Sequence, residues 1–157
     1  VFDLLQMWSD TADNSELSFD GDSNIYDSYD NESLKEDAFY LINYYYDTLN
    51  VRDYFTAYSL LGSEVQIKHS YEEFRQMNVR AVKIEVTDIT TNVVENEYKV
   101  LITVFADHHT RKDENTMTIH HLKTDYVIGL ENDVLKILSI DEQELSKTDH
   151  TISEDTN

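Results

Sequence analysis

The spacing of apolar residues changes once along this chain, near Val79, and this change constrains the fold more than any other feature. Before it, apolar residues recur every three or four positions, which is the period of an amphipathic helix. After it, apolar and polar residues alternate, which is the period of a strand. Helices followed by a strand meander predict an α+β fold, with N-terminal helices packed on a strongly curved antiparallel sheet.

The helical part begins with the longest periodic segment of the chain. Residues 33–49 carry an apolar stripe, and "SLKE" at their start predicts a capping box between Ser33 and Glu36. A second helix is predicted to follow a cap at Asn50 and to end at Gly62. The first two helices should therefore form a hairpin over the sheet.

Shorter elements fill the rest of the chain. The segment "EVQIK", residues 64–68, predicts a short strand, and Ser70 with Glu73 predicts a capping box that opens another helix. Four strands should follow, within residues 79–89, 98–106, 116–130 and 134–140.

Charge divides the chain into three parts. The formal net charge is −20, and about three quarters of it lies in the two flanks. We therefore predict an acidic flexible linker over residues 1–32, in which "VFDLLQMW" could form a short helix, a folded domain over 33–140 and an acidic tail over 141–157. The shortage of Lys and Arg argues against nucleic-acid binding, whereas an acidic inhibitor or immunity protein that caps a basic partner is one alternative function.

The sequence contains few features of a metal site. It has no cysteine, and the segment "DGDSNIYDSYDN" has Ile25 and Asn31 where a calcium loop needs Gly and Glu. The doublets His108–His109 and His120–His121 flank a turn, but a turn centred on Asp113 would place His108 opposite Thr118, out of register with the second doublet. We expect no metal and no cofactor.

Tyrosines are concentrated in the helical region. If the helices and sheet enclose a pocket, its candidate lining residues are Tyr40, Tyr44, Tyr54, Tyr58, Tyr98, His120, Asp125 and Tyr126. Of these, His120 and Asp125 are the candidates for an inward-facing base on the strands. Tyrosines at helical spacing more often belong to the core, with their hydroxyls at its rim, so we expect helices that close over the sheet.

The order of segments resembles the nuclear transport factor 2-like superfamily, a cone-shaped α+β fold. The resemblance rests on the helix 33–49 followed by "VRDYFTAYSLLGSE", "SYEEFRQM", "VKIEVTDI", "NEYKVLITVFA" and "DYVIGLENDVLKILSI". Within this superfamily, the chain is similar to extracytoplasmic proteins of Gram-positive bacteria. These are anchored lipoprotein domains, the N-terminal domain of resistance-type penicillin-binding proteins, and the bridging component of conjugative type IV secretion. Enzymes of the superfamily work inside the cone, so the fold alone does not fix the function.

Together these features favour a non-enzymatic binding or scaffold module outside the cytoplasm of a bacterium. The resemblance implies a membrane tether through a removed N-terminal segment, and a place in a conjugation or secretion machine. The alternative is a small-molecule enzyme or ligand carrier that uses the cone pocket.

The strand over residues 94–107 has apolar residues on both faces. Tyr98, Val100, Ile102 and Val104 should face the helices, and Leu101 and Phe105 should face the other way. An exposed apolar patch usually marks an interface, so we expect protein partners and a homodimer through this sheet face. Folding of "VFDLLQMW" over the patch is the alternative.

Overall fold

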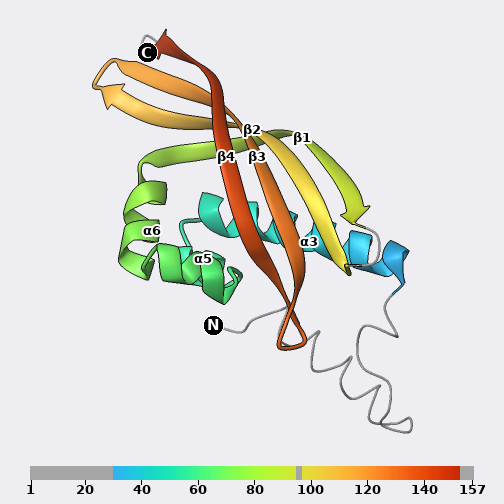
Figure 1. The fold of residues 1–157 in the computed structure, drawn as a ribbon. Coiled ribbons are helices and arrows are strands. Elements are labelled where there is room, and N and C mark those ends of the chain that lie inside the picture. The colour runs from blue at the N-terminus through green and yellow to red at the C-terminus, as the bar shows by residue number, and fades with distance from the viewer. Residues whose placement is uncertain (1–29, 95–96, 153–157) are drawn as a thin grey trace, which may run out of the picture.

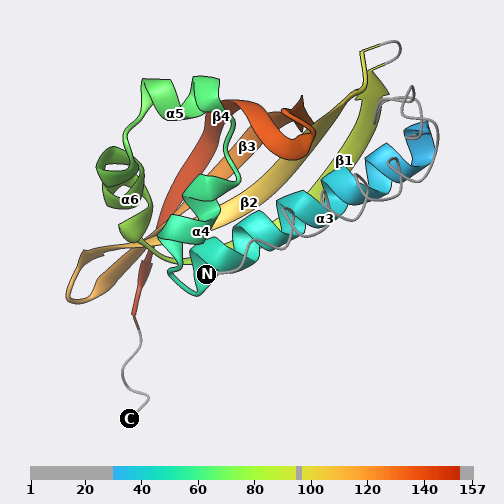
Figure 2. The same cartoon turned by 90° about the horizontal axis from the view of Figure 1, so that it is seen from below.

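The computed structural model describes residues 30–94 and 97–152, and within them helices precede strands (Figure 1). The elements are α3 (Asn31–Asn50), α4 (Tyr54–Ser59), α5 (Ser63–Lys68), α6 (Tyr71–Val79), β1 (Ala81–Val94), β2 (Lys99–Asp113), β3 (Thr116–Glu131) and β4 (Val134–Thr151). The strands form one antiparallel sheet in the order β1-β2-β3-β4. Figure 2 shows the helices on one face of this curved sheet, which confirms the predicted α+β fold.

Helix α3 begins earlier than the sequence predicts. Its N-cap is Asp30, whose Oδ1 accepts a hydrogen bond from the backbone N–H of Ser33 at 2.8 Å. The predicted capping box between Ser33 and Glu36 is therefore wrong, because an aspartate three residues upstream caps the helix equally well. The predicted apolar stripe is confirmed, since its members Leu34, Ala38, Leu41, Ile42, Tyr45 and Leu49 are all buried.

Asn50 connects the helix layer to the sheet and does not cap the next helix. Its Nδ2 donates to the carbonyl of Ile84 at 2.8 Å, and the Ile84 N–H donates to its Oδ1 at 2.8 Å. The cap of α4 is instead Asp53, whose carboxylate accepts from the N–H of Thr56. The end of α3 is thereby fastened to β1.

Residues 63–68 form the helix α5, so the prediction of a strand there is wrong. A run of five residues is too short for its period to separate helix from strand. The chain just before α5 does pair with the sheet: the Gly62 N–H donates to the Ile137 carbonyl at 2.7 Å, and the Ile137 N–H donates to Leu60. A Cβ at position 62 would lie 3.2 Å from that carbonyl oxygen, so this close approach favours glycine.

Helix α6 starts with the predicted capping box. The side chain of Ser70 accepts from the N–H of Glu73, and the Glu73 carboxylate accepts from the N–H of Ser70. Phe74 is the buried anchor of this helix. The capping box thus starts the helix, and Phe74 packs it against Tyr58 of α4.

The core lies between α3 and the first half of β2. Val100, Ile102 and Val104 are fully buried on the face that meets the helices, as the sequence predicts. On the neighbouring strands Ile128 and Ile137 are equally buried. Alternation of apolar and polar residues therefore fixed which face of the sheet is covered.

Strand β4 runs to Thr151, so the predicted acidic tail is wrong for residues 141–151. These residues pair with β3, from Asp141 opposite Asp125 to Thr151 opposite Thr116. All these residues are exposed. Their sequence therefore shows no alternation of apolar and polar residues, and this charged edge strand was not predicted. The predicted linker lies, up to residue 29, outside the described residues.

The hairpin between β2 and β3 brings the histidine doublets into register. His108 is the Cα partner of His120, because the turn lies at Glu114–Asn115 and a register shift follows between Arg111 and Asp113. The predicted pairing of His108 with Thr118 is therefore wrong, because the different turn centre changes every pair of the hairpin and the irregularity changes the pairs beyond it by one residue. Among the described helices, none has the length and hydropathy needed to cross a membrane.

Candidate functional site

A pocket of about 300 Å³ lies between the helix layer and the second half of the sheet. Helices α3, α5 and α6 supply one side of it, and β2, β3 and β4 supply the other. Its apolar wall includes Leu49, Phe74 and Ile140. This volume is at the lower end of the range of small-molecule sites.

Two tyrosines form the polar centre of the pocket. The hydroxyls of Tyr46 on α3 and Tyr126 on β3 lie 2.6 Å apart, and the Tyr45 ring packs edge-on against both rings. Burial raises the pKa of the Tyr46 and Tyr126 phenols, so both stay protonated at neutral pH. One of the two hydroxyl protons forms the hydrogen bond between the tyrosines, so the other hydroxyl can donate its proton to a further acceptor.

His108 contributes a neutral imidazole to the lining. Burial lowers its pKa from 6.5 to about 4, and the neighbouring His120 adds to the effect. At neutral pH the ring of His108 therefore offers one nitrogen as a hydrogen-bond donor and the other as an acceptor.

Glu142 of β4 supplies the carboxyl group at the rim. Although Glu142 is exposed to solvent, the surrounding protein partly desolvates its carboxyl and raises the pKa; repulsion from Glu144 raises it further, and His120 acts in the opposite direction. Environments that lower the pKa of a histidine and raise that of a carboxyl bring the two values together, which suits proton exchange. The pocket can thus bind a polar group and move a proton at its rim.

His120 lies beside the pocket on the same face of the sheet. Its Nδ1 is 2.8 Å from Oε1 of Glu144, and its Nε2 is 3.0 Å from Oγ1 of Thr110. The carboxylate and the hydroxyl fix the orientation of the ring. His120 is the Cα partner of His108 but is not itself one of the residues that line the pocket.

The other predicted pocket residues are spread over the molecule. Of the eight, Tyr126 lines the pocket, while Tyr40 lies on the outer face of α3 with its ring stacked on Tyr44. Tyr54 is buried at the start of α4, and the Tyr58 hydroxyl donates to the His69 carbonyl at 2.7 Å. Tyr40, Tyr44, Tyr54 and Tyr58 therefore act in packing and in joining the helices to one another.

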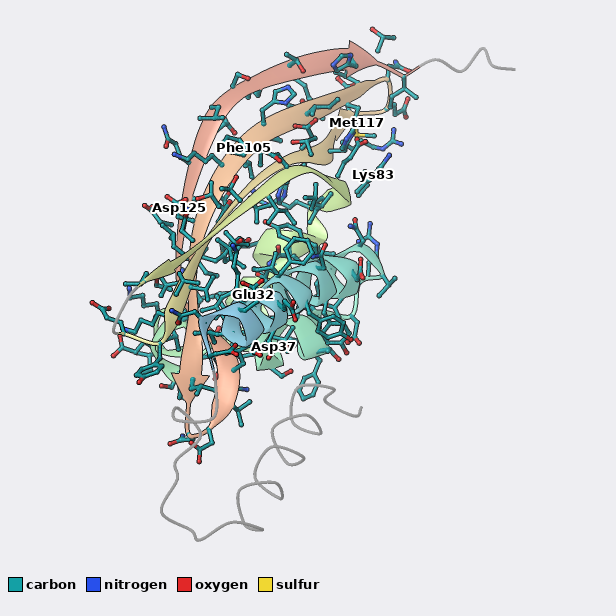
Figure 3. All side chains as sticks on the ribbon, turned by 90° about the vertical axis from the view of Figure 1, so that its right-hand side faces the viewer. Glu32, Asp37, Lys83, Phe105, Met117 and Asp125 are labelled. Carbon is teal, nitrogen blue, oxygen red and sulfur yellow. The ribbon has the colours of Figure 1, made fainter. Side chains whose placement is uncertain are left out.

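Asp125 and Tyr98 lie away from the pocket. The Asp125 carboxylate accepts from the Thr103 hydroxyl at 2.6 Å, and Figure 3 shows it on the side of the sheet away from α3. Tyr98 is half-exposed in the turn before β2 and has a positive φ of 53°. The predicted pocket residues did not include Tyr46, His108 and Glu142. Tyr46 carried a signal as the last residue of a tyrosine triplet beside a predicted apolar stripe, and His108 as part of a histidine doublet, whereas Glu142 carried none.

The predicted interface residues lie together on the convex face. Leu101 and Phe105 on β2 are partly exposed on the side away from the helices, and Leu101 is the Cα partner of Val127 (Figure 3 labels Phe105). Charged and polar residues surround them, with Lys123 opposite Phe105 and Asp125 opposite Thr103. The apolar area is therefore divided by polar residues.

Within residues 30–94 and 97–152, no group of three His, Asp or Glu side chains has the geometry of a metal site. His121 is instead 2.7 Å from Asp107, and His109 is 3.7 Å from Glu85, as isolated pairs on the convex face.

Comparison with solved structures decides the fold. A crystal structure of a protein from Streptomyces avermitilis, described as a candidate dehydratase of the NTF2-like family, superposes with a TM-score of 0.57. The match covers 73% of this chain and 98% of that one, at 12% sequence identity. The fold is NTF2-like. At this identity the likeness defines the architecture and leaves the activity open.

No profile of a known protein family matches this sequence. No curated protein matches it significantly. The finer resemblance to anchored Gram-positive domains therefore enters below only as part of a proposal.

Proposed function

We propose that this chain binds a small organic molecule in the pocket between α3, α5, α6 and the sheet. The observation that carries this proposal is the paired hydroxyls of Tyr46 and Tyr126 inside a cavity of about 300 Å³. A scaffold domain gains more from filling its core than from leaving a cavity lined by polar groups. The cavity therefore favours the ligand-binding alternative over a purely structural module.

The polar groups define what such a ligand offers. A carbonyl, ether or hydroxyl oxygen would accept from the tyrosine pair, and its apolar part would lie against Leu49, Phe74 and Ile140. His108 and Glu142 stand where a proton could be exchanged with the bound molecule. Binding is the proposed function, and acid–base turnover is a reaction that the same groups would support.

The test uses a neutral fluorescent probe, phenylnaphthylamine. Ile140 of β4 is half-buried, is the Cα partner of Tyr126 and lines the pocket, so Ile140→Trp should fill the cavity and abolish binding. Ser146→Trp places the same side chain on the same strand outside the pocket and should bind normally. Absence of saturable binding to the unmutated chain, or equal binding by both variants, would contradict the proposal.

A second candidate function is a protein-binding module of a membrane-anchored bacterial protein, outside the cytoplasm, as in a conjugation or secretion machine. The convex-face residues Leu101, Phe105 and Val127 favour it, because partly exposed apolar side chains at a sheet centre suit an interface. In its simplest form this face pairs two copies of the chain. Leu101→Glu combined with Phe105→Glu should then shift the sedimentation coefficient from dimer to monomer, and a monomer at tens of micromolar before mutation would exclude the homodimer.

A further inference from the structure

We infer that the ligand of the pocket is an organic anion, with an apolar body inside the cavity and its anionic group over Lys68, His69 and Arg80. The inference rests on the proposed function, because it concerns the part of the same ligand that extends from the pocket. It adds a charge requirement that the tyrosine pair does not impose.

A second hollow continues from the pocket. It has a volume of about 480 Å³, is open to solvent, and lies between the end of α5 and the outer side of α6. Lys68, His69 and Met77 line both the pocket and this groove. A molecule longer than the pocket would therefore extend past these three side chains into the groove.

The groove is lined by two cations, Lys68 and Arg80, neither of which forms, with the described residues, an ion pair of the kind that Arg75 and Lys112 form. Arg75 lies 2.9 Å from Glu72, and Lys112 lies 2.8 Å from Asp149. For Lys68 and Arg80, no carboxylate of the described residues comes within 4.0 Å. The chain has 12 Lys and Arg against 32 Asp and Glu, so a groove in which two cations face one carboxylate differs from this overall balance.

The acidic groups near the groove do not cancel this charge. Glu73 is the groove's one carboxylate; it accepts from the N–H of Ser70 and lies 3.8 Å from Nδ1 of His69. Glu64 and Glu142 line the pocket and not the groove. An anionic group is thus disfavoured inside the cavity and favoured outside it, which orients the ligand.

Met77 provides the apolar contact at the junction. Its side chain is 58% exposed on α6 although it lines both hollows. A flexible thioether adapts to ligands of different outline. The junction therefore combines an adaptable apolar surface with the Lys68 cation, and Arg80 lies beyond it in the groove.

Two probes with the same aromatic body separate the charge from the cavity: anilinonaphthalene sulfonate, which is anionic, and phenylnaphthylamine, which is neutral. The unmutated chain should bind the sulfonate more tightly. Lys68→Gln with Arg80→Gln should weaken sulfonate binding about tenfold and leave the neutral probe unchanged. The control, Lys83→Gln with Arg111→Gln, removes the same charge from exposed positions outside both hollows and should have little effect.

The outcomes distinguish this inference from the proposed function. Equal affinity for both probes, or equal weakening of both by the Lys68/Arg80 variant, would overturn the anionic ligand while pocket binding stands. Failure of both probes to bind would overturn the pocket itself. Competition by phosphatidylglycerol vesicles would identify a lipid headgroup as the anion, and absence of competition would identify a free organic acid.

Discussion

Strands β2 and β3 differ sharply between their two halves, although both halves belong to the same sheet face. In the half covered by α3, Val100, Ile102 and Val104 are fully buried, opposite Ile128 on β3 and its neighbours. In the half beyond α3, the corresponding positions of the same face hold His108, Thr110, Thr118 and His120. Figure 1 shows this second half projecting past the helices together with the end of β4.

The difference shows how one sheet serves two purposes. Where a helix closes the face, apolar burial supplies stability. Where the face stays partly open, polar and titratable groups border the pocket, and hydrogen bonds between strands hold their orientation. We call these the covered half and the open half, and four predictions test how independent they are.

The largest effect should come from the covered half. Ile102→Ala removes a side chain with no exposed surface and leaves a cavity, so the free energy of unfolding should fall by about 3–4 kcal/mol. Thr110→Ala, in the open half of the same strand, should cost less than about 1 kcal/mol. Urea denaturation of both variants measures the contrast, and equal losses would show that the halves are not distinct.

The next effect concerns the edge strand of the open half. A chain that ends at Asp141 removes the pairing partners of Thr116–Thr124 on β3, and the hydrogen bond from Thr118 to Asp149. We expect a loss of about 2 kcal/mol, with faster amide exchange in the open half. A chain that ends at Ile152 is the control. Unchanged exchange in the first variant would mean that 142–151 pairs only weakly.

A pH effect should isolate His108. Its pKa of about 4 in the folded chain lies below the usual 6.5, so over that interval the unfolded chain binds a proton that the folded chain does not. This contribution to stability is present above about pH 6.5 and is lost as the pH falls. The stability of the unmutated chain relative to His108→Gln should therefore decrease by about 2 kcal/mol from pH 7.5 to pH 5.

Glu142 contributes to the pH dependence with the opposite sign. Because its pKa is raised, the folded chain takes up a proton before the unfolded chain does, and stability increases as the pH falls through the range between its folded and unfolded pKa values. This term is common to both proteins in the comparison and cancels to first order. His150→Gln, at an exposed position of β4, is the control for replacing a histidine as such.

The smallest effect tests the tyrosine pair at the boundary of the two halves. Tyr46→Phe removes one hydroxyl of the 2.6 Å hydrogen bond and should lower the free energy of unfolding by about 1 kcal/mol. Binding of a probe with an oxygen acceptor should weaken as well. Tyr40→Phe, on the exposed face of α3, should change neither quantity, and an equal effect of both variants would remove the special role of the pair.

The sequence by itself determined the architecture and the covered half. The three- and four-residue spacing placed Leu41 and Ile42 in the core, and alternation placed Ile102 and Val104 opposite them. Both patterns are local consequences of backbone geometry. The capping box at Ser70 was readable for the same reason, since its two hydrogen bonds join residues three apart.

Only the tertiary structure decided the open half and the pocket. The turn at Glu114–Asn115 and one irregularity near Lys112 together set which histidines face each other, and no local pattern encodes the irregularity. The end of β4 could not be predicted from its exposed acidic residues, because their side chains meet water while their backbone pairs with β3. The pocket joins Tyr46, His108 and Glu142 from three distant segments, and Lys68 at its mouth from a fourth, so their proximity follows from the packing of helices on a curved sheet.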